Sequence, residues 1–110
     1  MDSMDSHTRL CMLLDIYGQL LSDRARETME LHYDEDMSLA EIADNEGISR
    51  QAVHDRIRRA VDSLEKLESR LGLAARFIAQ KEMAADALDA LDSGRDAKAR
   101  EILAALTSTL

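Results

Sequence analysis

The chain has 110 residues, which suits one domain with a helix or two appended and permits only a modest hydrophobic core. Hydrophobic residues make up 45% of it, but only three side chains are aromatic and proline is missing, so strong helix formers dominate and an all-α fold is predicted. The net charge of −8 argues against a surface that binds polyanions everywhere, and the single cysteine excludes a disulfide framework within the chain.

The sequence carries no recognisable targeting signal or membrane span. The first six residues are acidic and lack the basic and apolar regions of a signal peptide. No apolar run reaches the length needed to cross a bilayer. Cys11 stands among apolar neighbours and is predicted to be a buried, unreactive thiol. These features predict a cytoplasmic protein with no membrane partner.

Charge is divided unevenly along the chain. Residues 1–46 carry three basic and twelve acidic side chains, and residues 82–110 carry three basic and six acidic ones. Residues 47–81, by contrast, carry eight basic and four acidic side chains and are the positive segment. We therefore expect a polyanion to be repelled by most of the surface and attracted to the face that this segment forms.

Two helices are expected in the acidic first part of the chain. The first is predicted over about 8–17, with Ser6 or Thr8 as its N-cap. Its apolar stripe consists of Leu10, Leu13, Leu14 and Tyr17. The second is predicted to follow Ser22, whose hydroxyl can cap it, and to end just before residues 34–36, which are all acidic and are expected to form a solvated loop.

A helix-turn-helix is predicted from Ser38 to Ala60. Ser38 and Glu41 have the spacing of a capping box, in which each side chain accepts a backbone amide, and they open a short helix. Gly47 can take the left-handed conformation of the turn, and Ser49 can cap a long helix that begins at the next residue. The apolar residues expected to pack this motif together are Leu39, Ile42, Ala43, Ile48, Val53 and Ile57.

The long helix is predicted to continue to Gly72, and two more helices to follow over about 74–91 and 97–107, the second capped by Asp96. The expected stripe of the long helix continues through Ala60, Val61, Leu64, Leu67 or Glu68, and Leu71. The inward residues expected after it are Phe77, Ile78, Ala84, Ala87, Leu88, Leu91, Ala99, Ile102, Leu103 and Leu106. The sequence thus predicts a helix-turn-helix domain over residues 1–72 and a C-terminal helical extension over residues 73–110.

The predicted nucleic-acid-binding residues lie on the side of the long helix that its apolar stripe leaves outward. Arg50 and Gln51 stand at the helix N-terminus, the part that enters a major groove, where Arg can pair with guanine and Gln with adenine. Further arginines and a serine hydroxyl suit phosphates. The predicted site consists of Ser49, Arg50, Gln51, His54, Asp55, Arg56, Arg58 and Arg59. The competing interpretation is a solvated charged face, with ion pairs Asp55–Arg59 and Asp62–Lys66 at four-residue spacing.

The sequence also bears on classes of function other than DNA binding. An enzyme, a bound metal and a cofactor are not expected, because His7, His32 and His54 are isolated and the glycines form no phosphate loop. A protein-interaction module is the second class, in which the long helix and the extension form a homodimer by helix packing. Such a dimer would present two recognition helices to half-sites about one duplex turn apart. RNA binding through the arginines of the long helix is the third class.

The runs LLDIYGQLLS (13–22), LHYDEDMSLAEIA (31–43) and ISRQAVHDRIRR (48–59) resemble the YlxM-like helix-turn-helix proteins of bacteria. The resemblance covers about residues 8–78, and Ser-Arg-Gln-Ala-Val is its most specific part; the tail after about Gln80 has no counterpart in it. The middle also resembles region 4 of bacterial sigma factors, in which the matching helix reads a promoter element in duplex DNA.

This resemblance implies a sigma-region-4-like helical bundle. It also implies a link to the signal recognition particle, as a regulator of its genes or as an accessory that binds the particle's RNA or its GTPase. Two departures from the family pattern, at residues 23–26 and at His54, bear on base preference and not on the fold.

Overall fold

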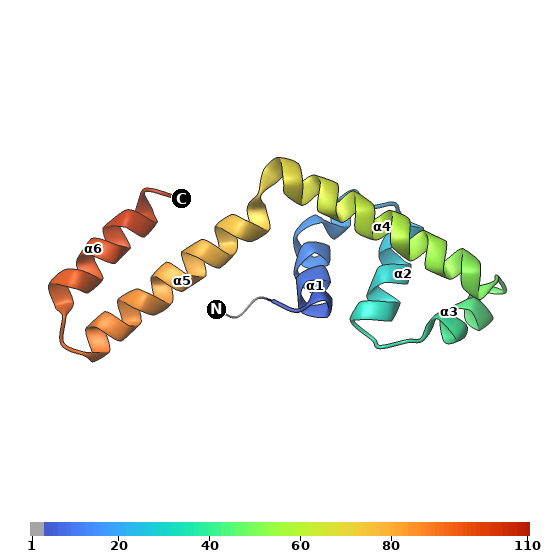
Figure 1. Cartoon of the computed structure of the whole chain (residues 1–110), viewed down its shortest axis with the longest axis horizontal. Helices are drawn as coiled ribbons and strands as arrows, with labels where there is room; N and C mark the ends of the chain where they lie inside the picture. The colour runs from blue at the N-terminus through green and yellow to red at the C-terminus, as the bar shows by residue number, and fades with distance from the viewer. Residues whose placement is uncertain (1–3) are drawn as a thin grey trace. The chain divides into compact units, whose positions relative to one another are not determined.

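The structure is a computed structural model that describes residues 4–110, and every regular element in this range is helical (Figure 1). The all-α prediction is therefore confirmed. The elements are α1 (Ser6–Tyr17), the 3-10 turn η1 (Gly18–Leu20), α2 (Asp23–Tyr33), α3 (Leu39–Glu46), α4 (Arg50–Leu71), α5 (Leu73–Asp92) and α6 (Asp96–Thr107). The chain divides into two compact units, one ending at Gly72 and one comprising Leu73–Leu110.

The core of the first unit forms where α1, α2 and α3 each pack against α4. The whole predicted stripe of α1 is buried, and Met29 and Thr28 of α2 join it. From α4 the buried side chains are Val53, Ile57, Ala60 and Leu64, at helical steps of three and four. Leu71, the last residue of α4, was expected in this stripe but is 54% exposed.

Each of the first four α-helices begins with a side-chain cap. Ser22, Ser38 and Ser49 accept the amides that the sequence predicted, at 3.0–3.2 Å. The cap of α1 is Asp5, whose Oδ1 accepts the Thr8 amide at 2.7 Å, so the choice of Ser6 or Thr8 was wrong. The prediction for α6 was also wrong, because Asp96 is the first helical residue and the N-cap position makes no side-chain bond.

Two polar contacts join α1 to the second half of α4. The Arg9 guanidinium donates to both carboxylate oxygens of Glu65, at 2.6 and 3.0 Å. These bonds lower the pKa of Glu65 and raise the pKa of Arg9 relative to their ordinary values. The hydroxyl of Tyr17, whose ring is almost fully buried, donates to Glu68 at 2.6 Å. Glu65 and Glu68 of α4 thus each bind a side chain of α1.

Cys11 of α1 is half-buried and not fully buried as predicted, and its thiol lies 3.7 Å from the carbonyl oxygen of Tyr33. Desolvation and the neighbouring carboxylates, in that order, raise the pKa of this thiol. A raised pKa lowers the fraction of reactive thiolate at neutral pH, which agrees with the predicted lack of reactivity.

The second unit is a hairpin of α5 and α6 that packs through alanines. Its buried side chains are Ala74, Ala87, Ala90 and Ala99. Four larger residues expected inside are instead substantially exposed, namely Phe77, Leu88, Leu91 and Leu103. Small side chains at the contact let two helices approach closely, and the larger ones then flank the contact without being covered. Among the described residues, no helix combines the length and apolarity that a membrane span requires.

Candidate nucleic-acid interface

The helix-turn-helix is formed by α3, the turn at residues 47–49 and the first half of α4. Ser38 and Glu41 form the reciprocal capping box, at 3.0 and 3.1 Å. Gly47 is left-handed, with φ 69° and ψ 33°, and both its amide and the amide of Ile48 bond to the Ala43 carbonyl. Ile48 was predicted to pack with the apolar residues of this motif but is only half-buried.

Apolar contacts set which side of α4 faces outward. Ile42 and Ala43 of α3 and Val53 and Ile57 of α4 are all buried, and α3 packs directly on α4. The small side chain of Ala43 permits the close crossing that the motif needs. Rotation of α4 about its axis would expose Val53, which has no accessible surface, so the outward side is held in place by the core.

Six of the eight predicted site residues cluster on or beside this outward side, which we call the recognition face. It consists of Ser49, Arg50, Gln51, His54, Asp55 and Arg58. Asp55 is only partly exposed and takes part in each of the polar contacts described within the recognition face. Its Oδ1 accepts from the Gln51 amide at 3.0 Å and lies 3.7 Å from Arg58 and 3.8 Å from the His54 ring. The exposed side chain of Arg50 has no polar partner within the described residues.

The ion pairs of the competing interpretation do not form. Asp55 contacts Gln51 and Arg58, and no Asp55–Arg59 or Asp62–Lys66 bridge occurs in the part of the chain that the structure describes. The charged face is therefore arranged around Asp55, at spacings of three and four residues toward both ends of the helix. Because Asp55 restrains Gln51, part of the entropy cost of ordering that amide is met before any ligand binds.

Arg56 has a different environment from the one predicted. Its side chain is 18% exposed, and Nη1 donates to Thr28 Oγ1 at 3.0 Å and to both Glu46 oxygens at 2.9 and 3.1 Å. Arg24 also reaches Glu46, at 3.2 Å. Arg56 thus ties α4 to α2 and to the end of α3. Sequence spacing could not reveal this pair, because only the fold brings residues ten apart across the turn together.

Arg59 was also predicted to belong to the site but lies outside the recognition face. Its side chain lines a groove on the other flank of α4, together with residues from η1 and α2. At about 100° per residue, Arg59 lies roughly 100° around the helix from Arg58. The two neighbouring arginines therefore serve different surfaces.

Comparison with known proteins agrees with this motif. Residues 4–103 match the family described as "Putative helix-turn-helix protein, YlxM / p13 like". The chain is 45% identical over 98 residues to a UPF0122 protein of Symbiobacterium thermophilum, covering 89% of this chain and 92% of the relative. It is 38% identical over 105 residues to one of Halalkalibacterium halodurans, covering 96% and 94%, and 37% identical over 98 residues to one of Desulforamulus reducens, covering 89% and 84%.

The extent of these matches corrects one expectation. The motifs in the sequence placed the end of the resemblance near residue 78, whereas the family match continues to residue 103 and includes most of the α5–α6 hairpin. The hairpin is thus part of what the relatives share with this chain. The chain belongs to the UPF0122 family of YlxM-like helix-turn-helix proteins.

Proposed function

We propose that this protein binds nucleic acid through the recognition face, with duplex DNA as the preferred ligand. The observation that carries the proposal is the first turn and a half of α4, where Arg50, Gln51 and His54 are exposed while the residues beneath them are buried. A rigid helix that presents such side chains at its N-terminus has the form that enters a major groove.

The chemistry of each side chain supports base contacts. Arg50 can donate two parallel hydrogen bonds to O6 and N7 of guanine. Gln51 uses one N–H on Asp55 and keeps a second N–H and its oxygen, which are the two groups that a bidentate contact to adenine requires. Arg58 and the Ser49 hydroxyl are placed for phosphates on either side. Residues 1–46 and 82–110 are net acidic, which disfavours approach of a polyanion to the surfaces that they dominate.

The test uses a duplex selected by the purified protein from a random-sequence pool. Changing both Arg50→Ala and Gln51→Ala is expected to weaken binding of the selected duplex by roughly 2–5 kcal/mol. Arg58→Ala should instead reduce the salt slope by about one for any duplex. The control is Lys98→Ala with Arg100→Ala on α6, which removes two cations outside the recognition face. Selection of no duplex above background would refute the proposal.

A link to the signal recognition particle is a finer expectation that rests on the resemblance to YlxM-like proteins. The same preparation can be titrated with the particle's RNA and with its GTPase, each at two salt concentrations. If the protein selects no duplex but binds the RNA, and the recognition-face variants weaken that binding, the result would favour an accessory protein that binds the particle's RNA. GTPase binding that these variants leave unchanged would favour a protein accessory.

The hairpin supports a second candidate function, which is self-association. Its fully buried side chains are all alanines, and Phe77, Leu88, Leu91 and Leu103 are between 44% and 62% exposed. A 38-residue hairpin with so small a core gains little stability alone, and an identical face on a second copy offers matching apolar side chains for a four-helix arrangement. Sedimentation equilibrium should report a dimer that Leu88→Asp with Leu103→Asp dissociates. A wild-type monomer at high concentration would contradict it.

A further inference from the structure

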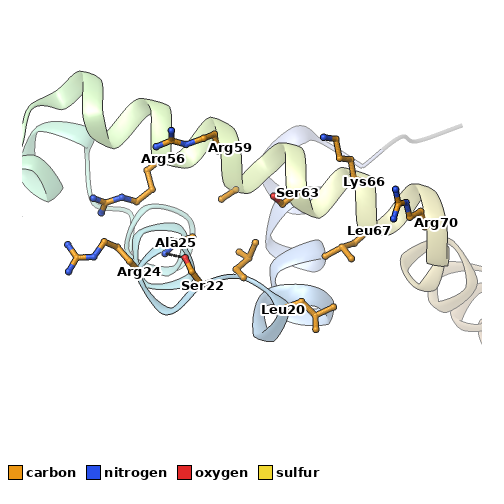
Figure 2. A pocket seen from close by; sticks show the side chains of 12 residues that line it. Leu20, Ser22, Arg24, Ala25, Arg56, Arg59, Ser63, Lys66, Leu67 and Arg70 are labelled. Carbon is orange, nitrogen blue, oxygen red and sulfur yellow. Dashed lines mark hydrogen bonds between the residues drawn. The ribbon is translucent and has the colours of Figure 1, made fainter.

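A groove of about 630 Å³ runs along the flank of α4 that faces η1 and the start of α2 (Figure 2). Figure 2 shows α4 on one side of it and the segment that bears Leu20, Ser22 and Arg24 on the other. The lining residues all belong to the first unit. A groove of this size is within the range that proteins use to hold ligands.

The lining is basic and contains no carboxylate. It includes five cationic side chains, which are Arg24, Arg56, Arg59, Lys66 and Arg70. Arg24 and Arg56 share the carboxylate of Glu46, which is not part of the lining. Arg59, Lys66 and Arg70 are exposed and have no side-chain partner among the residues that the structure describes. The groove therefore concentrates positive charge in a protein that is negative as a whole.

The spacing of the three unpaired cations indicates a long ligand. Positions 59, 66 and 70 differ by seven and four residues, which puts them on one side of α4. At 1.5 Å per residue the row is about 16 Å long. One phosphate or carboxylate cannot reach both ends, so a ligand that engages the whole row carries several negative groups along its length.

The apolar part of the lining favours a strand over a rigid duplex. Leu21, Ala60 and Leu67 line the groove between the cations, and Leu20 stands at its side with 65% of its surface exposed. The sugars and bases of a single strand can lie against such a surface while the phosphates meet the cations. The lining has no aromatic side chain for base stacking, so recognition here is of the backbone and not of base sequence.

We infer that this basic groove is a second nucleic-acid site, which holds a single-stranded segment by its phosphates. Around α4 it lies roughly a third of a turn from the recognition face. The groove and the recognition face therefore lie on different sides of α4, and the groove does not depend on duplex binding by the recognition face.

The test is the affinity of a fluorescein-labelled twelve-nucleotide oligouridine, measured by anisotropy at several salt concentrations. The variant is Arg59→Gln with Lys66→Gln and Arg70→Gln. At a salt slope of about 0.7 per phosphate contact, losing three contacts should lower the slope by about 2 and the affinity at 0.1 M salt by about 100-fold. Ser63→Glu, which places a carboxylate in the same lining, should weaken binding in the same direction.

The matched control is Arg95→Gln with Lys98→Gln and Arg100→Gln, which makes the same charge change on exposed positions of the second unit. Equal losses in this control would overturn the inference, because the effect would then be one of net charge. Failure of the wild type to bind the oligonucleotide would overturn it too. Tight binding of ATP alone, or displacement of the strand by a leucine-containing acidic peptide, would assign the groove to another ligand.

Two further measurements separate the sites. The Arg50→Ala, Gln51→Ala variant should keep its affinity for oligouridine, and the groove variant should keep its base preference on the selected duplex. Circular dichroism should show equal thermal unfolding for the groove variant and the wild type, since all three changed side chains are exposed. A recognition-face variant that loses both ligands would mean that the two sites are one.

Discussion

The two units of this chain use their large apolar side chains in opposite ways. In the first unit Leu13, Tyr17, Met29, Ile42 and Leu64 are almost completely buried, whereas in the second only alanines are. The first unit also has a side-chain cap on each α-helix and ion pairs that connect its helices, while α6 begins without a side-chain cap.

This difference indicates that the first unit contributes most of the free energy of folding. The first unit has the burial that a cooperative core requires, and it is the unit that holds the recognition face in position. The hairpin has little burial of its own and leaves its leucines available to a partner. We therefore expect opening events of lowest free energy in the hairpin, which matched substitutions in the two units can examine.

The largest expected contrast comes from one substitution made in each unit. Leu64→Ala removes a side chain with no accessible surface and should lower the free energy of unfolding by about 2–5 kcal/mol. Leu88→Ala removes one that is 62% exposed and should change it by less than about 0.5 kcal/mol. Urea unfolding followed by circular dichroism, at concentrations where the protein is monomeric, measures both. Equal losses would show that the hairpin is part of the same core.

The second contrast separates a structural arginine from one that is proposed to bind nucleic acid. Arg56→Ala removes bonds to Thr28 and Glu46 in a largely buried setting and should cost about 1–3 kcal/mol in unfolding free energy. Arg58→Ala, at a side chain 66% exposed, should cost less than about 0.5 kcal/mol but weaken duplex binding. If Arg56→Ala left stability unchanged and reduced the salt slope for DNA, Arg56 would belong to the binding surface as the sequence suggested.

The third contrast concerns helix caps. Ser38→Ala removes half of the capping box of α3 and should lower the unfolding free energy by about 1 kcal/mol. Arg95→Ala changes the N-cap position of α6, which has no side-chain bond to lose, and is expected to have an effect of only a few tenths of a kcal/mol. Thermal unfolding of the two variants in parallel gives the comparison. A larger loss for Arg95→Ala would mean that the hairpin limits stability.

The elements of the first unit could be predicted from sequence because their signals are local. The capping box at Ser38, the left-handed Gly47 and the stripe from Val53 to Leu64 each depend on residues a few positions apart. The positions of Arg56 and Arg59 outside the recognition face could not be predicted from such local signals. Arg56 is satisfied by Thr28 and Glu46, and Arg59 faces a groove whose opposite wall is η1 and α2.

The hairpin shows that helical spacing of apolar residues does not by itself predict their burial. Phe77, Leu88 and Leu91 of α5 recur at helical spacing, and the usual inference from such spacing is a buried stripe. The fully buried positions are alanines, while Ile78, Ile102 and Leu106 of the predicted stripe are half-buried. Periodicity identifies an apolar face but not whether the same chain covers it, since that depends on what packs against it.

The smallest expected effect is a pH dependence of the contact between α1 and α4. Because Arg9 lowers the pKa of Glu65 in the folded state, the pair contributes stability above the ordinary glutamate pKa, roughly pH 4.3, and loses it as pH falls through the lower, folded-state value. Both side chains are about two-fifths exposed, so the contribution should be below about 1 kcal/mol.

Glu65→Gln should therefore be less stable than the wild type at pH 7, and the difference should shrink as the pH falls below the ordinary glutamate pKa and through the lower folded-state pKa. Glu101→Gln, which removes the carboxylate of the exposed 3.8 Å pair with Lys98 in the hairpin, is the matched control and should cost less at pH 7. Urea midpoints across this pH range measure both variants. A Glu65→Gln difference that persists unchanged at pH 3 would mean that packing of the side chain, and not its charge, holds α1 against α4, because protonation would then have removed nothing.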